Sequence, residues 1–246
     1  MPTIYLSPST QEFNPYVNGG NEEYYMNLIT DAMIPYLEAT GINYVRNTPD
    51  MTAASSIRAS NAGNYDFHLA LHSNAVGGEN SGSATGSQVY YYPYSENSRR
   101  AADIFANNLK LIYPNPSKVT AIPTTSLGEV ARTRAPAVLI EYAFHDNEQD
   151  ANWIKNNINF IAENTVASLA DYFGIPFVTP QNNSMGRVIT MGGNLNIRSG
   201  PGLENPVIGT IPNGASVQIL SRTPQWYNIS YDGITGYSSA QYITLM

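Results

Sequence analysis

The sequence predicts an α/β domain, with a mostly parallel sheet covered by helices on both faces, followed by a small all-β barrel. Three observations support this prediction. Apolar strand-like runs alternate with helix-like periods through residues 1–175. A stretch rich in Pro, Asn and Gln then interrupts the pattern. Beyond it the helical period vanishes, and short β-prone runs alternate with Gly, Pro and Asn turns.

The first strand and the first helix follow from local signals. The strand is predicted over residues 4–6 and leads into a polar loop. Asn21 can cap the helix, whose first turn holds Glu22 and Glu23, favourably placed against the helix dipole. Pro35 lies inside the apolar period of this helix, so we expect a kink or a local break there.

The alternation continues to the end of the first domain. Further strands are predicted at INYV, YDFHLAL, SQVYYY and AVLIEY, and further helices at MTAASSIRASNAG, residues 95–113 and residues 147–173. In a parallel sheet, functional side chains gather beyond the carboxyl ends of the strands. His72 and Glu141 both lie at or near such ends.

The change of composition predicts two domains. Residues 176–185 carry no apolar period and indicate a linker between a domain of residues 1–175 and a domain of residues 186–246. The second domain has about sixty residues, which is near the lower size at which a domain folds alone.

Composition limits the chemistry. The chain has no Cys and three His, which excludes a disulfide framework and a Cys-based zinc site, so a transition metal would need His, Asp or Glu ligands. A net charge of −7 with twelve Lys and Arg argues against a nucleic-acid partner. Eighteen Tyr suit either the binding of a sugar or peptide polymer or half-buried sheet faces. The start of the chain lacks the features of a signal peptide, and no run reaches membrane-spanning length.

The second domain resembles a bacterial SH3 domain. The resemblance rests on NLNIRSGPG, followed by VIGTIPNGASVQIL and QWYNISYDGITGYSSAQYI, and covers nearly all of residues 186–246. It implies a module that tethers enzymes to peptidoglycan. Trp226, Tyr227 and Tyr237 offer faces that can pack or bind a ligand, and for Trp226 we favour a place in the core.

The first domain resembles the zinc-dependent N-acetylmuramoyl-L-alanine amidases. The resemblance rests on NEEYYMNLI, YDFHLALHSNA and RAPAVLIEYAFHDN in this order, and it covers roughly residues 1–175. It implies a peptidoglycan hydrolase that cleaves the amide bond between N-acetylmuramic acid and L-alanine, with zinc as the cofactor. It also implies an extracellular or cell-wall location, no membrane insertion, and an endolysin-like or otherwise exported enzyme. We expect a monomer.

The chemistry of amide hydrolysis assigns roles to three residues. Zinc with an open coordination position polarises the carbonyl and activates water, and a carboxylate moves the proton to the leaving nitrogen. In the resemblance, Glu23 and His72 fall on metal-ligand positions and Glu141 falls on the catalytic glutamate. Taken alone, Glu23 can simply favour the helix N-terminus, and His72 is an even choice between a ligand and a core residue.

The other two histidines have weaker assignments. His68 alternates with His72 on one strand and therefore shares its face, so we interpret it as structural or as a support for the site. His145 lies close in sequence to Glu141 and is a candidate for orienting the substrate or a carboxylate.

The third zinc ligand of the family is a histidine in the loop after the first strand, and here the loop LSPSTQEFN has none. Glu12 is the best substitute because it is anionic, whereas Gln11 and Asn14 offer only a neutral carbonyl oxygen. His145 is a further alternative. Three hypotheses remain: an active amidase with a rearranged ligand set, an amidase-like protein that binds wall fragments without cleaving them, and a zinc peptidase acting on stem peptides.

Overall fold

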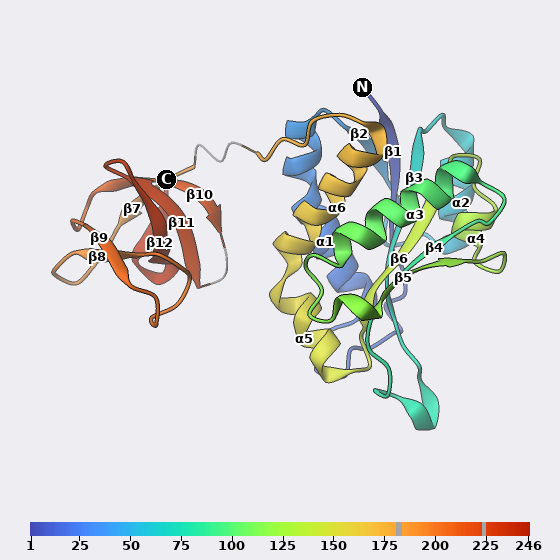
Figure 1. Ribbon diagram of the computed structural model, residues 1–246, viewed down its shortest axis with the longest axis horizontal. Helices are drawn as coiled ribbons and strands as arrows, with labels where there is room; N and C mark the ends of the chain where they lie inside the picture. The colour runs from blue at the N-terminus through green and yellow to red at the C-terminus, as the bar shows by residue number, and fades with distance from the viewer. Residues whose placement is uncertain (181–183, 223–224) are drawn as a thin grey trace. The chain divides into compact units, whose positions relative to one another are not determined.

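The computed structural model describes residues 1–180, 184–222 and 225–246. The chain divides into two compact units, Met1–Pro180 and Gln181–Met246 (Figure 1). Each unit has a hydrophobic core of its own. The predicted linker of residues 176–185 includes residues 181–183, which lie outside the described residues.

The first unit contains a six-stranded sheet with the strand order β2-β1-β3-β6-β4-β5. Neighbouring strands are parallel except β4 and β6, which are antiparallel. The predicted α/β class with a mostly parallel sheet is therefore confirmed. The strands are β1 (Thr3–Pro8), β2 (Asn43–Arg46), β3 (Phe67–Asn74), β4 (Ser87–Tyr91), β5 (Val119–Pro123) and β6 (Ala137–Phe144).

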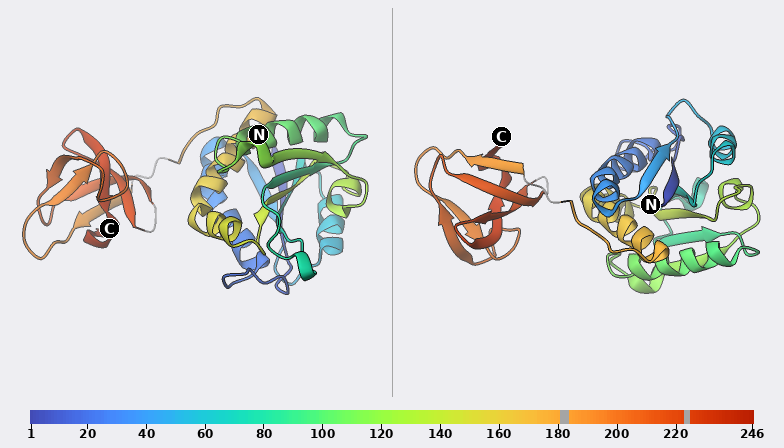
Figure 2. Two further views of the ribbon diagram at one scale, coloured as in Figure 1. Left: turned by 60° about the horizontal axis from the view of Figure 1, so that its bottom comes forward. Right: turned by 90° about the horizontal axis from the view of Figure 1, so that it is seen from above.

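Helices cover both faces of this sheet (Figure 2). The pleat of β3 sends Phe67, Leu69 and Leu71 into the larger core, so His68 and His72 point to the opposite face. None of the helices in the described ranges is long and apolar enough to cross a membrane. On the face with the larger core, called the larger face, lie α1 (Glu22–Thr40), α3 (Glu96–Leu109), α5 (Glu148–Asn156) and α6 (Ile158–Phe173). On the opposite or smaller face, which has the smaller core, lie α2 (Ala53–Ala62) and α4 (Gly128–Ala131).

Two helical predictions differ from the structure. The helix α1 runs through Pro35 without a break, because Met33 and Leu37 on either side of it are fully buried and tertiary packing holds the turn. The predicted helix over residues 147–173 is instead two helices, α5 and α6. At the break, the Asn157 side chain donates a hydrogen bond to the carbonyl oxygen of Trp153 at 2.7 Å, which competes with helical bonding.

The second unit is a seven-stranded antiparallel sheet with the order β13-β7-β10-β11-β12-β8-β9, which confirms the predicted all-β class. Its core contains Val188, Ile197, Val217, Ile219 and Ile229. The strands are β7 (Ser184–Val188), β8 (Leu195–Arg198), β9 (Val207–Ile211), β10 (Ser216–Arg222), β11 (Trp226–Tyr231), β12 (Ile234–Ser239) and β13 (Ile243–Leu245).

Asp150 anchors the end of β6 that carries the candidate site. Its Oδ2 accepts hydrogen bonds from the backbone N–H groups of Gly86 and Phe144, each at 3.0 Å. Its Oδ1 accepts a hydrogen bond from the hydroxyl of Tyr113 at 2.5 Å. The side chain is buried, and hydrogen bonds to a buried carboxylate are strong. One residue thus joins α5 to the end of β6 and to the chain that enters β4.

We expect Asp150→Ala to lower the free energy of unfolding by about 3 kcal/mol, because three buried donors lose their acceptor. The measurement is urea unfolding followed by circular dichroism at the helical band, which reports the first unit because all long helices lie there. The control is Gln149→Ala, an exposed change on the same helix, which should shift stability by less than about 0.5 kcal/mol. Equal stability of the two variants would contradict the anchoring role.

Candidate functional site

Four ionisable side chains meet near the carboxyl ends of β3 and β6. His72 on β3 and Glu141 on β6 are partners in the register of the sheet. Glu22 approaches from the first turn of α1, and Glu129 approaches from α4. The cluster therefore draws on both helical layers, and it lies where a parallel sheet places its functional groups.

His72 is held between two carboxylates. Its Nδ1 lies 2.8 Å from Oε1 of Glu22, and its Nε2 lies 3.0 Å from Oε2 of Glu129. Glu22 is 1% exposed and Glu129 is 5% exposed. Burial alone would lower the pKa of His72, but the hydrogen bonds with Glu129 and Glu22 outweigh it and raise the pKa well above its ordinary value. Each ring nitrogen of His72 therefore faces a carboxylate.

The helix phase of α1 decides which of its two glutamates reaches the ring. Asn21 caps the helix by accepting a hydrogen bond from the N–H of Tyr24 at 2.8 Å, and this places Glu22 and Glu23 in the first turn. Successive helical residues point about 100° apart, so only one of the two can face the sheet. Glu22 does so, four residues before the buried Met26.

The loop between β1 and α1 reaches the same nitrogen of His72. The Nε2 atom of Gln11 lies 3.4 Å from Nδ1 of His72. The amide of Asn14 donates hydrogen bonds to Oε1 of Gln11 at 3.1 Å and to Oε2 of Glu22 at 2.7 Å. Gln11 and Glu22 thus both lie at Nδ1 of the ring, and Asn14 bridges them.

Glu129 connects the ring to β1 and to the second histidine of β3. Its Oε1 accepts a hydrogen bond from the hydroxyl of Ser7 and lies 3.5 Å from Nε2 of His68. The other nitrogen of His68 lies 3.0 Å from the hydroxyl of Ser60 on α2. Burial would raise the pKa of Glu129, but the contacts with His68 and His72 lower it well below its ordinary value. Glu129 is therefore ionised at neutral pH.

Glu141 has a different environment from the other two glutamates. Its Oε2 is buried and has no hydrogen-bond partner in the part of the chain that the structure describes. Burial raises the pKa of Glu141 to about 7; the charge of His72 opposes this, and the charges of Glu22 and Glu129 add to it. A carboxyl group that titrates near neutral pH can both accept and return a proton.

Of the predicted site residues, the structure brings His72 and Glu141 together and leaves Glu23 and Glu12 outside their cluster. Glu23 was expected as a metal ligand together with His72, but the carboxylate next to the ring is that of Glu22. Partial burial and the nearby charge of Glu12 raise the pKa of Glu23. Glu12, expected as the third ligand, is exposed. These placements follow from the phase of α1 and from the path of the loop before it.

His145 packs the loop against β3. Nδ1 of His145 lies 2.8 Å from the carbonyl oxygen of Ser73 and 3.0 Å from the hydroxyl of Ser73. The His145 ring stacks on the ring of Tyr16, with 5.2 Å between the ring centroids. The backbone carbonyl of His145 also accepts a hydrogen bond from Val17. The structure thus gives His145 contacts with Ser73 and Tyr16, and its role in orienting the substrate or a carboxylate stays a prediction.

Sequence reasoning missed two members of the cluster. Glu22 had a usable signal, because it shares the helical phase of the apolar residues Met26 and Met33, whereas Glu23 does not. Glu129 lies in a helix of four residues, where no period can form. Its only local signal is a carboxylate between Leu127 and Val130 in an otherwise polar segment.

The donors at Nδ1 of His72 limit what ion the site can hold. Outside residues 181–183 and 223–224, no three His, Cys, Asp or Glu side chains are arranged to hold a metal. Glu22 and His72 supply one carboxylate and one imidazole, and the next group at this nitrogen is the amide of Gln11. Glu129 lies at the opposite nitrogen of the ring. The group that Gln11 turns to the ring is its NH2, which cannot bind a metal, so the set as arranged offers two metal donors, fewer than the three protein ligands of a usual zinc site.

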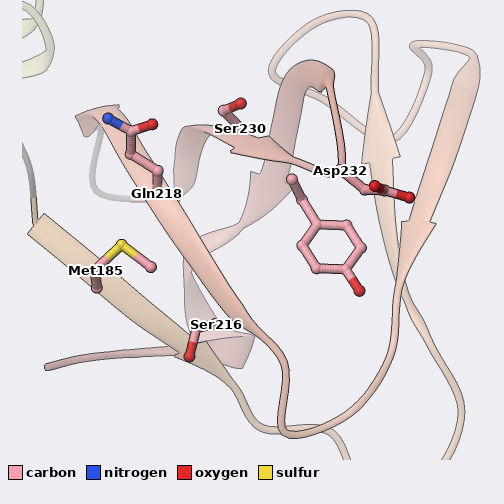
Figure 3. A pocket seen from close by; sticks show the side chains of 6 residues that line it. Met185, Ser216, Gln218, Ser230 and Asp232 are labelled. Carbon is pink, nitrogen blue, oxygen red and sulfur yellow. The ribbon is translucent and has the colours of Figure 1, made fainter.

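The second unit carries a groove of different chemistry. Figure 3 shows Met185 on β7 and Gln218 on β10 at one side, with Asp232 at the turn between β11 and β12. The backbone at Asp232 has a φ of 48°, a left-handed conformation that Asp tolerates in tight turns. A mixed polar and apolar lining suits the binding of a ligand. The lining residues are Met185, Ser216, Gln218, Ser230, Tyr231 and Asp232.

Two family models match the chain. Residues 11–171 match the model of the N-acetylmuramoyl-L-alanine amidases, and residues 193–244 match that of the bacterial SH3 domain. The candidate N-acetylmuramoyl-L-alanine amidase YrvJ of Bacillus subtilis is 28% identical over 97 residues, which are 39% of this chain and 19% of YrvJ. Bacteriocin BCN5 of Clostridium perfringens is 33% identical over 73 residues, which are 30% of this chain and 8% of the bacteriocin. The chain therefore spans a small part of the curated relatives it matches.

Solved amidase structures share the fold of the first unit. The N-acetylmuramoyl-L-alanine amidase AmiC2 of Nostoc punctiforme matches with a TM-score of 0.61 and 16% identity, over 70% of this chain and 97% of that one. The amidase from Clostridium difficile 630 matches with a TM-score of 0.61 and 18% identity, over 70% of this chain and 97% of that one. The catalytic domain of the CD27L endolysin, which targets Clostridia difficile, matches with a TM-score of 0.57 and 20% identity, over 70% of this chain and 98% of that one.

The raised pKa of Glu141 predicts a pH-dependent stability. The pKa of this carboxyl is about 7 in the fold, against an ordinary value of 4.5, so its ionisation destabilises the folded state as the pH rises from 4.5 to 7. Relative to the wild type, we expect Glu141→Gln to be more stable at pH 8 by up to about 3 kcal/mol and to gain little at pH 4. Chemical unfolding in the presence of a chelator measures the difference.

The matched control for this comparison is Glu38→Gln, which changes an exposed glutamate on α1. Its effect on stability should be small and nearly the same at both pH values. A stability difference for Glu141→Gln that does not change with pH would contradict the assigned burial of the ionised carboxylate.

Proposed function

The chain belongs to the N-acetylmuramoyl-L-alanine amidase family, and from this premise we propose that it hydrolyses the amide bond between N-acetylmuramic acid and L-alanine in peptidoglycan. The observation that carries the proposal is the register pairing of His72 with Glu141, with Glu22 on the ring of His72. All three residues lie inside the matched segment, residues 11–171. This activity would place the protein at the cell wall or outside the cell.

We also propose zinc as the cofactor. Glu22 and Nδ1 of His72 would hold the ion, and the proximity of these two groups supports this assignment. For Gln11 to serve as a third donor, its amide would have to turn the oxygen, which accepts a hydrogen bond from Asn14, toward the ring. When bound, zinc supplies Lewis acidity and lowers the pKa of a bound water. Since an amide oxygen is a poorer zinc ligand than imidazole, we expect weaker affinity than at a site with two histidines and a carboxylate.

Glu141 is the proposed general base. Its unpaired Oε2 can accept a proton from the attacking water, and its pKa of about 7 allows the same group to return that proton to the leaving amine. The new bond joins the water oxygen to the carbonyl carbon of the lactyl group, and the C–N bond to L-alanine breaks. Glu22 and His72 keep their positions because each is buried and hydrogen-bonded.

The second unit, which carries the bacterial SH3 domain, would hold the enzyme on peptidoglycan. The groove between Met185, Gln218 and Asp232 supports this proposal, since its mixed lining can accept both the polar and the apolar parts of a sugar and peptide polymer.

The central test is the release of amino termini from purified peptidoglycan. We expect the wild-type protein to contain about one zinc per chain and to expose new L-alanine amino groups. Glu141→Gln should lower the rate by a factor of about 10²–10⁴, the usual contribution of a general base, while wall binding stays intact. Glu38→Gln serves as the control with unchanged turnover. Wall binding without amine release by the wild type would instead favour an amidase-like binder.

A second test separates binding from cleavage. A chain ending at Pro180 keeps the whole first unit and its core. We expect it to sediment far less with insoluble wall than the full chain. Its turnover of soluble muropeptides should stay within about twofold of the full chain, because the candidate site lies wholly in the first unit and distant changes have little effect on each other. Undiminished sedimentation would remove the second unit from its proposed role.

A further inference from the structure

Gln88 lies next to the proposed general base, and the proposed reaction does not use it. It belongs to β4, where it is the register partner of Glu141 on the antiparallel neighbour β6. Partners in an antiparallel pair point to the same face of the sheet, with their Cβ atoms about 4.5–5.5 Å apart. Gln88 and Glu141 therefore lie side by side on the smaller face, which also carries His72.

Two donors hold the amide oxygen of Gln88. Its Oε1 accepts a hydrogen bond from Nδ2 of Asn74 at 2.9 Å and another from the hydroxyl of Tyr90 at 2.8 Å. Asn74 ends β3 and Tyr90 lies on β4, with β6 between these two strands, so the hydrogen bonds span the strand that carries Glu141. Burial and then the nearby charge of Glu141 raise the pKa of Tyr90, which also places the network beside this carboxyl.

The fixed oxygen leaves the NH2 group of Gln88 to meet a ligand. An amide side chain has two acceptor sites on its oxygen and two N–H donors. Both acceptor sites are used, whereas the NH2 group has no hydrogen-bond partner in the described part of the chain. The side chain is partly exposed, so a substrate can reach it. Within the same residues, Oε2 of Glu141 is an unpaired acceptor, so an unpaired acceptor and an unpaired donor lie on neighbouring strands.

From this arrangement we propose that Gln88 is a further catalytic residue, whose NH2 group donates a hydrogen bond to the carbonyl oxygen of the amide that is cleaved. The inference rests on the proposed hydrolysis with Glu141 as the base. As water attacks the carbonyl carbon, negative charge develops on the carbonyl oxygen, and a donor that is already oriented stabilises this charge. Asn74 and Tyr90 supply the orientation and are therefore positioning residues.

The first test detects the contact and needs no turnover. The probe is the soluble fragment N-acetylmuramoyl-L-alanyl-D-isoglutamine, which contains the bond in question, added to the full chain carrying Glu141→Gln so that it is not cleaved. In nitrogen-15 NMR spectra, the side-chain NH2 signals of Gln88, identified by their loss in Gln88→Met, should shift when the fragment binds. Adding Gln88→Met to the same chain should raise the dissociation constant of the fragment by about 2–10-fold, the effect of one lost hydrogen bond.

The second test measures turnover of the same fragment by the full chain. Gln88→Met keeps the length of the side chain and removes the donor, so it should lower kcat by about 100-fold. Tyr90→Phe removes one of the two groups that orient the amide and should lower kcat by less. Thr120→Ala is the matched control, because Thr120 is the exposed register partner of Gln88 on β5, one strand further from Glu141. Its kcat and its affinity for the fragment should equal those of the wild type.

The outcomes separate this inference from the proposed hydrolysis. Unshifted NH2 signals with the fragment bound, no binding of the fragment, or a wild-type affinity in Gln88→Met would each overturn the inference. A shifted pH dependence of kcat in Gln88→Met with unchanged affinity would also overturn it, because the amide would then act on Glu141 and not on the substrate. If the wild type releases no amino groups but the NH2 signals shift and the affinity falls as expected, the proposed hydrolysis fails and the contact with Gln88 stands.

Discussion

The ring of His72 between two carboxylates is the interaction on which the rest of the site depends. Near this ring lie the buried Glu22 and Glu129 and the buried Oε2 atom of Glu141, and buried charges are costly unless they are paired. Glu22 and Glu129 each share a hydrogen bond with one ring nitrogen, which keeps them ionised. Glu141 has no such partner for its Oε2, and its pKa rises to about 7. Pairing with His72 therefore keeps Glu22 and Glu129 ionised, whereas the unpaired Glu141 can exchange a proton near neutral pH.

The fold supplies this pairing through ordinary features of a parallel sheet. Alternation along β3 puts His68 and His72 on the smaller face, and the parallel register sets Glu141 beside His72. The N-terminus of α1 and the short helix α4 then approach the same strand ends from opposite layers. Asp150 secures the end of β6 and its junction with the chain entering β4, so that the strand carrying Glu141 has a fixed end.

These same features explain which parts of the fold and of the candidate site could be predicted from the sequence. Apolar runs and helical periods predicted the sheet, the placement of His72 and Glu141 near strand ends, and the change to an all-β second domain. Helix phase could also have separated Glu22 from Glu23. Glu129 could not be found in this way, because its contacts span 57 residues to His72 and 122 residues to Ser7, and its four-residue helix has no period. Pairing over such distances is decided by packing, which no local pattern records.

The charge of Glu129 acts on the site in two directions at once. Through Nε2 it orients the ring of His72, and through space it adds to the effects that raise the pKa of Glu141. A neutral residue at this position would therefore remove a hydrogen-bonded charge from His72 and also lower the pKa of Glu141. Both effects come from a single carboxylate on α4 that lies 3.0 Å from one nitrogen of His72. The position of Glu129 beside His72 and the raised pKa of Glu141 are thus parts of one electrostatic balance.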